Sequence, residues 1–151
     1  MRSVRKSSQS SLEVIRVNRD VIMNKMGTIQ RCLRRIDEEY AGDEQNLYHY
    51  TKQDSIVLNL QRACEASIDL AMHIVAEKDL GIPQNSRDAF DLLQRHGLID
   101  EPLCKRMKAM VGFRNIAVHD YQAIQIPILK GILDHHLADF LQFIERVSKI
   151  Q

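Results

Sequence analysis

The chain has 151 residues, of which 44% are hydrophobic, 27% are charged and only 5% are aromatic. This length allows one domain with its own core and is too short for two ordinary domains. Six Gly and three Pro residues interrupt it, a composition that suits helices and gives little support to a sheet.

The formal net charge of +1 hides an asymmetry along the chain. Basic residues outnumber acidic ones by three in residues 1–16, so residues 17–151 carry a net charge of −2. The larger part of the chain therefore lacks the broad positive field of a protein that binds nucleic acid non-specifically. Any contact with nucleic acid must come from a local cationic site.

Residues 1–16 are basic, rich in Ser and without sustained apolar periodicity. They are predicted to form a flexible basic arm, or to be a non-native or upstream extension, ahead of one domain at 17–151. No apolar run is long enough to span a bilayer, and no signal peptide is evident. The sequence thus predicts a cytoplasmic protein with no membrane partner.

Apolar residues then recur every three or four positions in four long segments and one short one. The first helix is predicted to end near Tyr40, and the second to run from a capping pair, Thr51 with Asp54, to about Asp79. Ser86 is predicted to cap a short helix that ends at Gly97, and Asp100 the next one. The last helix is predicted at 127–148. The fold class is therefore all-α, an up-and-down bundle of four long helices plus a short one.

The three cysteines, Cys32, Cys64 and Cys104, are odd in number and widely spaced. Each lies among apolar residues, which predicts buried free thiols and neither disulfides nor metal ligands. A second polar group lies in the last helix, at Asp134, His135, His136 and Asp139. Its adjacent histidines point to different sides of a helix, so it is predicted to be a solvated face. No metal site is predicted.

The stretch RNIAVHDY, Arg114 to Tyr121, closes the fourth long helix with polar groups. Asn115 and His119 are four residues apart and can lie side by side, and Arg114 and Tyr121 share a face if the helix continues that far. Arg114 and His119 diverge by about 140° on a regular helix. One helix therefore does not direct both at one atom, which favours a site between two copies of the chain, a homodimer.

An arginine and a histidine without a metal or a nucleophilic Ser or Cys suit the cleavage of RNA. The substrate's own 2′-hydroxyl is the nucleophile, an imidazole moves the protons, and a guanidinium holds the phosphate as negative charge builds. Two symmetry-related copies of His119 could act as base and acid. The structural alternative is that Arg114 and His119 only satisfy carbonyls at the end of the helix.

A polar stripe on the second helix leaves two readings open: Arg62, Glu65, Asp69 and His73. Such a stripe is usually an exposed, ion-paired surface. The other reading is that it lines the substrate groove and that Arg62 supplies a further contact to RNA.

The pattern Arg-x4-His-x-Tyr in RNIAVHDY, late in a small helical chain, resembles the signature of HEPN ribonucleases and, among them, of the HepT toxins. The resemblance extends through MNKMGTIQRCLRRIDEEY, DSIVLNLQRACEASIDLAMHI, LGIPQNSRDAF and HHLADFLQFI, and so covers nearly everything from Val17 onward.

The resemblance implies the toxin of a type VII-like toxin–antitoxin system, with a HEPN-type bundle and a dimeric, metal-independent ribonuclease activity that needs no cofactor. Arg114 and His119 would be catalytic, with Asn115 supporting them. RNA would be the substrate, with tRNA as one candidate. A minimal nucleotidyltransferase antitoxin, MntA-like, would silence the toxin by adding AMP to Tyr121. The alternative is a non-catalytic helical module that partners a nucleotidyltransferase, but such a module has no need of His119.

Overall fold

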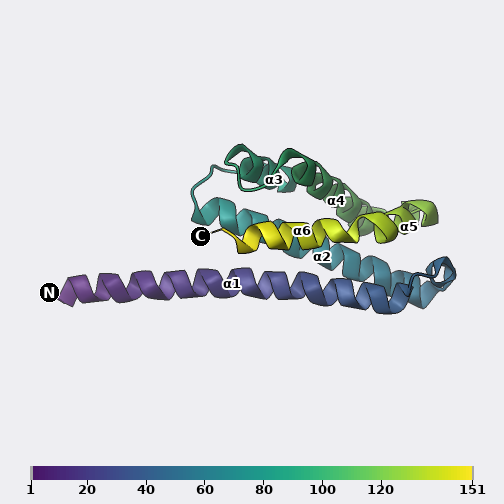
Figure 1. Cartoon of the computed structure of the whole chain (residues 1–151), viewed down its shortest axis with the longest axis horizontal. Coiled ribbons are helices and arrows are strands. Elements are labelled where there is room, and N and C mark those ends of the chain that lie inside the picture. Colours follow the sequence, from purple (N-terminus) through teal and green to yellow (C-terminus); the bar gives the residue numbers. More distant parts are fainter. Residues whose placement is uncertain (1, 151) are drawn as a thin grey trace.

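The computed structural model describes residues 2–150, with side chains from residue 19 onward. In this range the order is α1 (Arg2–Tyr40), η1 (Glu44–Tyr48), α2 (Tyr50–Glu77), α3 (Ser86–Arg95), α4 (Glu101–His119), η2 (Tyr121–Ala123), α5 (Ile126–His135) and α6 (Leu137–Ser148), as Figure 1 shows. The η elements are short 3-10 helices. The predicted all-α bundle is confirmed, and no strand occurs in this part of the chain.

α1 and α2 form a long hairpin. The chain reverses after Tyr40, where Ala41 and Gly42 take positive φ angles of 50° and 68° that end the helix. The apolar seam of α1 packs inside the chain, with Ile29, Leu33 and Ile36 all buried.

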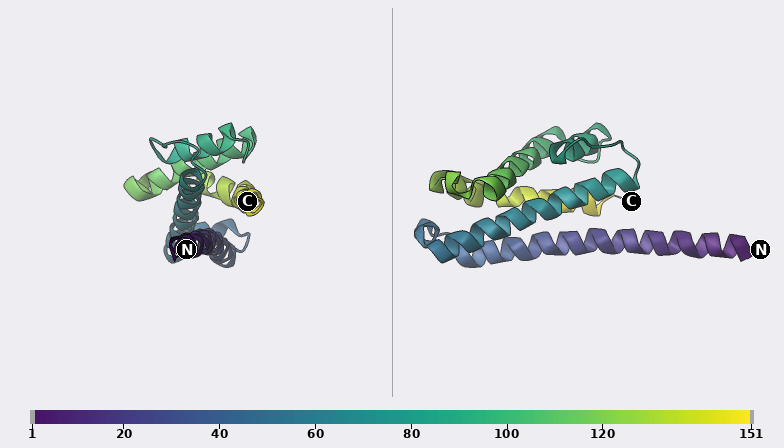
Figure 2. Two further views of the ribbon diagram at one scale, coloured as in Figure 1. Left: turned by 90° about the vertical axis from the view of Figure 1, so that its left-hand side faces the viewer. Right: turned by 180° about the vertical axis from the view of Figure 1, so that it is seen from behind.

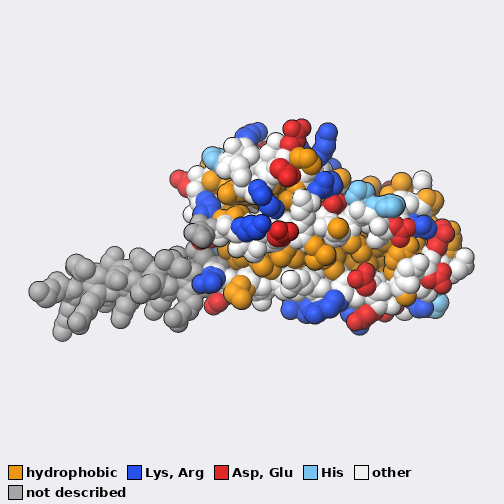
Figure 3. All heavy atoms as spheres, in the orientation of Figure 1, with side chains coloured by type: hydrophobic (Ala, Val, Ile, Leu, Met, Phe, Trp, Pro, Cys, Tyr) orange, Lys and Arg blue, Asp and Glu red, His pale blue; other side chains and the backbone are white. Residues whose placement is uncertain are grey.

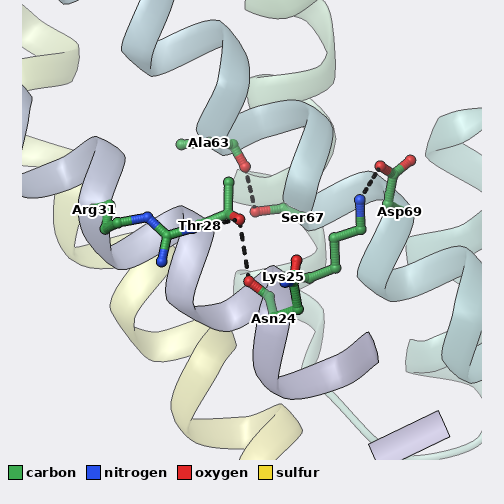
Figure 4. Close-up of polar contacts among 7 residues, drawn as sticks. All are labelled: Asn24, Lys25, Thr28, Arg31, Ala63, Ser67 and Asp69. Atoms are coloured by element: carbon green, nitrogen blue, oxygen red, sulfur yellow. Dashed lines mark hydrogen bonds and ion pairs between the residues drawn. The ribbon is translucent and has the colours of Figure 1, made fainter. Parts of the chain in front are cut away.

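Figure 4 shows one polar contact that joins the two helices of this hairpin and others within each helix. Lys25 of α1 pairs with Asp69 of α2 at 3.1 Å, Nζ to Oδ2. The buried hydroxyl of Ser67 donates to the carbonyl oxygen of Ala63 at 2.8 Å, one turn back, so burial leaves it satisfied.

α2 is the central helix of the fold. It contacts α1, α3, α4 and η1, and Figure 2 shows it between α1 on one side and the layer of α3 and α4 on the other. Its buried residues cover about 200° of the helix circumference. They include the small residues Ala63, Ala66, Ser67 and Ala71. Because small side chains allow close approach, helices can pack against α2 from several directions.

α6 closes the bundle against α1 and α4. Its buried Asp139 forms an ion pair with Arg106 of α4, with 2.9 Å between Oδ1 and Nε. The packing against α1 is less complete: a groove of about 450 Å³ remains there, lined in part by Leu33, Leu137 and Leu141. On the face shown in Figure 3, hydrophobic side chains form a band between α1 and the helices above it.

The structure corrects the prediction of one last helix at 127–148. The backbone breaks at His136, with φ −122° and ψ −2°, which separates α5 from α6. At this break the ring Nδ1 of His136 lies 3.0 Å from Oδ2 of Asp139. A local contact of this kind competes with helix continuation. His136 and Asp139 thus serve the helix junction, and because Asp139 is buried, the predicted solvated face is wrong for that residue. Asp134 instead accepts a hydrogen bond from the hydroxyl of Tyr40 at 2.7 Å. The described part of the chain has three long and three shorter α-helices.

Two predicted N-caps are also wrong by one or two positions. His49 caps α2 through Nδ1, which accepts from the backbone N–H of Lys52 at 3.4 Å, in place of Thr51. Asn85 caps α3 by accepting from the N–H of Asp88 at 2.9 Å, in place of Ser86. The cap at Asp100 is confirmed: Oδ1 accepts from the N–H of Leu103 at 2.9 Å.

α1 begins at Arg2 and so includes most of the segment that the sequence set apart as an arm. The side chains of residues 2–18 lie outside the described ones. The domain boundary between residues 16 and 17 therefore stays a prediction. No helix in the described range is long and apolar enough to cross a bilayer.

Candidate active site

Arg114 lies on the buried face of α4. The buried residues of this helix cover about 180° of its circumference, and Arg114 falls near the middle of that arc. They are Leu103, Cys104, Met107, Met110, Val111, Phe113 and Ala117. A charged side chain on a core-facing position costs free energy unless something compensates it. Arg114 is partly buried and thus takes a core-facing position although it is charged.

The surroundings compensate Arg114 only in part. Its Nη2 donates to the Ser86 hydroxyl oxygen at 3.3 Å, whereas its buried Nε has no hydrogen-bond partner among the described residues. Burial raises the pKa of the Cys64 thiol to about 12, and the nearby positive charge of Arg114 opposes that rise. Arg114 therefore inserts between α2 and the start of α3 with hydrogen-bonding capacity left for a ligand.

Asn115 and Arg114 line the same cavity, which has a volume of about 400 Å³ and opens beside the start of α3. His119 does not line it. It is the last residue of α4 and is exposed. Two apolar neighbours near this end, Ile116 and Val118, are 45% and 47% exposed. The end of α4 thus presents a histidine on an unusually apolar surface.

Tyr121 does not continue α4. Asp120 takes φ −153° and ψ 64°, which ends the helix and places Tyr121 in η2. The predicted alignment of Tyr121 with Arg114 along one helix is therefore wrong. The phenol instead donates a hydrogen bond to Oδ1 of Asp54 on α2. Tyr121 is 39% exposed and borders a shallow cavity of about 270 Å³.

Asp54 was missed as a site residue. Burial raises the pKa of the Tyr121 phenol far above its ordinary value, and the hydrogen bond to Asp54 and its negative charge raise the pKa further. The two residues are separated by 67 positions, so no local spacing indicates the contact. The sequence offered Asp54 only as half of a capping pair.

Arg62 lies on a different side of α2. Its side chain is exposed, and its positive charge opposes the burial-driven rise in the pKa of Cys32 on α1. On α2 it is about 160° around the helix from Cys64, the residue that Arg114 approaches. Within one chain the described structure does not bring Arg62 to Arg114, and its contact with RNA stays a prediction.

The remaining polar groups have structural partners. Asp69 pairs with Lys25, and Nε2 of His73 lies 3.4 Å from Oε2 of Glu77. All three cysteines are free and buried, as predicted. Among the described residues, no cluster of three or more His, Cys, Asp or Glu side chains could hold a metal ion.

The comparisons with known proteins agree with this arrangement. The family model described as ribonuclease HepT-like matches residues 29–147, which is most of the chain. The chain belongs to the ribonuclease HepT-like family. It is 52% identical over 129 residues to the mRNA nuclease HepT of Shewanella oneidensis, which covers 85% of this chain and 97% of that protein.

Solved structures show the same fold. The tri-AMPylated HEPN toxin of Shewanella oneidensis, in complex with an MNT antitoxin, superposes with a TM-score of 0.82 at 51% identity, covering 87% of this chain and 98% of that one. The Bacillus subtilis protein YutE superposes with a TM-score of 0.76 at 17% identity, covering 86% of this chain and 87% of that one. This second likeness shows the fold alone. The predicted HEPN-type bundle is confirmed.

The Tyr121–Asp54 contact leads to a prediction about pH. Replacing Asp54 with Asn removes the negative charge but keeps an acceptor, so the pKa of Tyr121 should fall towards its ordinary value while staying above it, because burial remains. In the parent chain the contact stabilises the fold at pH values below the ordinary phenol pKa, and this stabilisation is lost as pH rises above it.

The measurement is an ultraviolet titration of tyrosine ionisation in Asp54→Asn and in the parent. From each curve, the curve of the same protein with Tyr121→Phe added is subtracted. The corrected curves isolate Tyr121 from the other three tyrosines. An unchanged midpoint in Asp54→Asn would show that the carboxylate does not act on this phenol.

Proposed function

We propose that this chain is the toxin of a toxin–antitoxin pair, a metal-independent ribonuclease that acts in the cytoplasm. One observation carries the proposal: the chain keeps an incompletely partnered guanidinium on the buried face of α4, where an apolar side chain would pack better. Such a violation of packing is expected where a residue is retained for function. Membership of the ribonuclease HepT-like family supports the same reading.

Arg114 and His119 take complementary roles in this proposal. A 2′-oxygen of RNA attacks the neighbouring phosphorus, its proton passes to one His119, and the 5′-oxygen leaves with a proton from another. The products are a 2′,3′-cyclic phosphate and a 5′-hydroxyl end. Arg114 holds the phosphate as negative charge builds on its oxygens. Asn115, next to Arg114 on α4, helps to position the phosphate.

A homodimer supplies the two histidines. The support comes from Ile116 and Val118, whose exposed apolar side chains lie next to His119. Pairing two copies of this helix end would bury these side chains and bring both histidines to one cleft.

Control is proposed to act through Tyr121. A minimal nucleotidyltransferase antitoxin, MntA-like, would join its phenolic oxygen to the α-phosphorus of ATP, with pyrophosphate leaving and the phenolic proton released. The Shewanella relative was solved as an AMPylated toxin with its MNT antitoxin. As substrate we propose RNA: mRNA is the class in the relative's name, and tRNA is the second class to test.

Removing either proposed catalytic group should strongly reduce cleavage without destabilising the fold. Arg114→Met keeps an apolar side chain of similar length on the buried face, so the free energy of unfolding should stay within about 1 kcal/mol or rise. Cleavage should fall on the order of 10² to 10³. His119→Ala should lower cleavage by roughly 10² to 10⁴. Because this residue is exposed, thermal stability should not change.

These effects are measured as kcat/KM on labelled RNA together with thermal melts. EDTA should change nothing, and a substrate with deoxyribose at the cut site should resist. Dependence on an added divalent metal, or cleavage of DNA, would contradict the mechanism.

The dimer prediction uses the exposed end of α4. Ile116→Glu places a charge on the proposed interface, so the protein should sediment as a monomer and lose cleavage in parallel. Ile82→Glu is the matched control. Ile82 is 85% exposed and follows the C-terminal end of α2, whereas Tyr121 contacts α2 near its N-terminal end. The proposed cleft with two histidines would be contradicted if the parent protein sediments as a monomer at concentrations where it cuts RNA.

Tyr121→Phe should keep most of the cleavage, since Phe retains the ring and loses only the contact with Asp54. It should also escape neutralisation, because it offers no oxygen to the antitoxin. The measurement is survival and intact mass after co-expression with the nucleotidyltransferase, compared with Tyr50→Phe, a tyrosine that is 83% exposed. Protection of cells carrying Tyr121→Phe, with AMP absent or on another residue, would exclude Tyr121 as the switch.

A further inference from the structure

The cavity beside Arg114 holds more positive charge than one catalytic arginine requires. It lies between the start of α3 and the second half of α4, and its volume is about 400 Å³. Three basic residues line it, Arg87, Lys108 and Arg114, together with the acidic residues Asp88 and Asp91. The charged side chains that line the cavity therefore sum to +1. This charge would balance the single negative charge of one phosphodiester.

The two acidic residues are already engaged by the chain. Asp91 pairs with Lys108, at 2.9 Å between Oδ1 and Nζ, and this hydrogen bond raises the pKa of Lys108. Asp88 accepts from the backbone N–H of Gln84 through Oδ2 at 2.9 Å. Neither Arg87 nor Arg114 has a carboxylate partner within 4 Å in the described part of the chain. The positive charge that remains available to a ligand is thus that of the two arginines.

Both arginines are held in place by uncharged groups. Nε of Arg87, an exposed residue of α3, donates a long hydrogen bond of 3.5 Å to the carbonyl oxygen of Lys108 on α4. A Cβ atom at Gly112 would lie 3.0 Å from Nη2 of Arg87, so the absence of a side chain there leaves room for this guanidinium. Arg114 is held by Ser86, the residue next to Arg87. Pre-positioned guanidinium groups bind phosphate oxygens with little loss of side-chain entropy.

We propose that this cavity binds a backbone phosphate of RNA next to the phosphate that is cut, with Arg87 as its main contact. The inference rests on the proposed function and adds a binding subsite to it. Arg114 lines this cavity and is also proposed to hold the phosphate that is cut. The two phosphates must therefore be neighbours on the RNA strand. The first turn of α3 adds the partial positive charge of a helix N-terminus on the same side. Arg87 therefore positions RNA and does not touch the reacting atoms.

The test is binding of a 2′-O-methyl RNA oligonucleotide, which cannot be cut, measured by fluorescence anisotropy over a range of salt concentrations. Arg87→Ala should weaken binding about tenfold at low salt. It should also reduce the slope of log affinity against log salt by about 0.7, the value for one phosphate contact on a single strand. On cleavable RNA the loss should lie in KM. Arg87→Lys should bind more tightly than Arg87→Ala but less tightly than the parent. It keeps the positive charge but lacks the planar guanidinium that can donate two hydrogen bonds to one phosphate.

Two further variants separate binding from folding. Arg95→Ala removes an exposed charge at the other end of α3 and should change neither affinity nor salt slope. Gly112→Ala should displace the Arg87 guanidinium and so weaken binding. Because Ala has a higher helix propensity than Gly, weaker binding by this variant could not be attributed to unfolding of α4.

Two results would overturn the subsite. If Arg87→Ala and Gly112→Ala bind with the parent's affinity and salt slope while the parent cuts RNA, the subsite is wrong and the proposed function stands. If the parent neither binds nor cuts RNA, both are wrong.

Discussion

The guanidinium of Arg114 occupies the middle of the face by which α4 packs against the rest of the bundle. The chain arranges three elements around it: α2 brings Cys64 close, the start of α3 offers the Ser86 hydroxyl, and a cavity leaves one side open. The unpartnered Nε shows that this arrangement does not fully replace the hydration lost on burial. A fold optimised for stability alone would place Leu or Met here, so the bundle is organised around a charge that it does not need for packing.

The end of α4 then separates three candidate site residues that are close in sequence. Arg114 points inward, His119 is exposed at the last helical residue, and the turn at Asp120 sends Tyr121 to α2. Each group therefore meets a different environment: a partly buried cavity, an apolar surface and a carboxylate. A continuous helix would already separate Arg114 from His119, but it would place Tyr121, seven residues after Arg114, on the same face as that arginine. The turn at Asp120 is thus as important to the site as the motif itself.

The sequence predicted the fold and part of the site for identifiable reasons. Apolar spacing located the helices, and the cap at Asp100 was confirmed, because these depend on neighbours a few residues away. The contact of Tyr121 with Asp54 joins side chains 67 positions apart, which spacing does not reveal. The break at His136 is local, but the apolar pattern continues across it and so does not indicate it. The burial of Arg114 did leave a signal. Leu103, Met107 and Met110 are spaced by four and three, and Arg114 is the next position in that series.

The hydrogen bond between Tyr121 and Asp54 has a direct consequence under the proposed control by AMPylation. An AMP ester removes the phenolic hydrogen, so the donor of this bond is lost. It also adds a phosphate with at least one negative charge beside a carboxylate, which makes the former contact repulsive. The modified side chain must therefore leave α2 and turn towards positive charge or solvent. Along the chain towards α4, the nearest Arg or Lys to Tyr121 is Arg114, seven residues earlier. The carboxylate that holds the unmodified tyrosine on α2 would thus repel the modified one, so the proposed modification would both add negative charge and free the side chain to move.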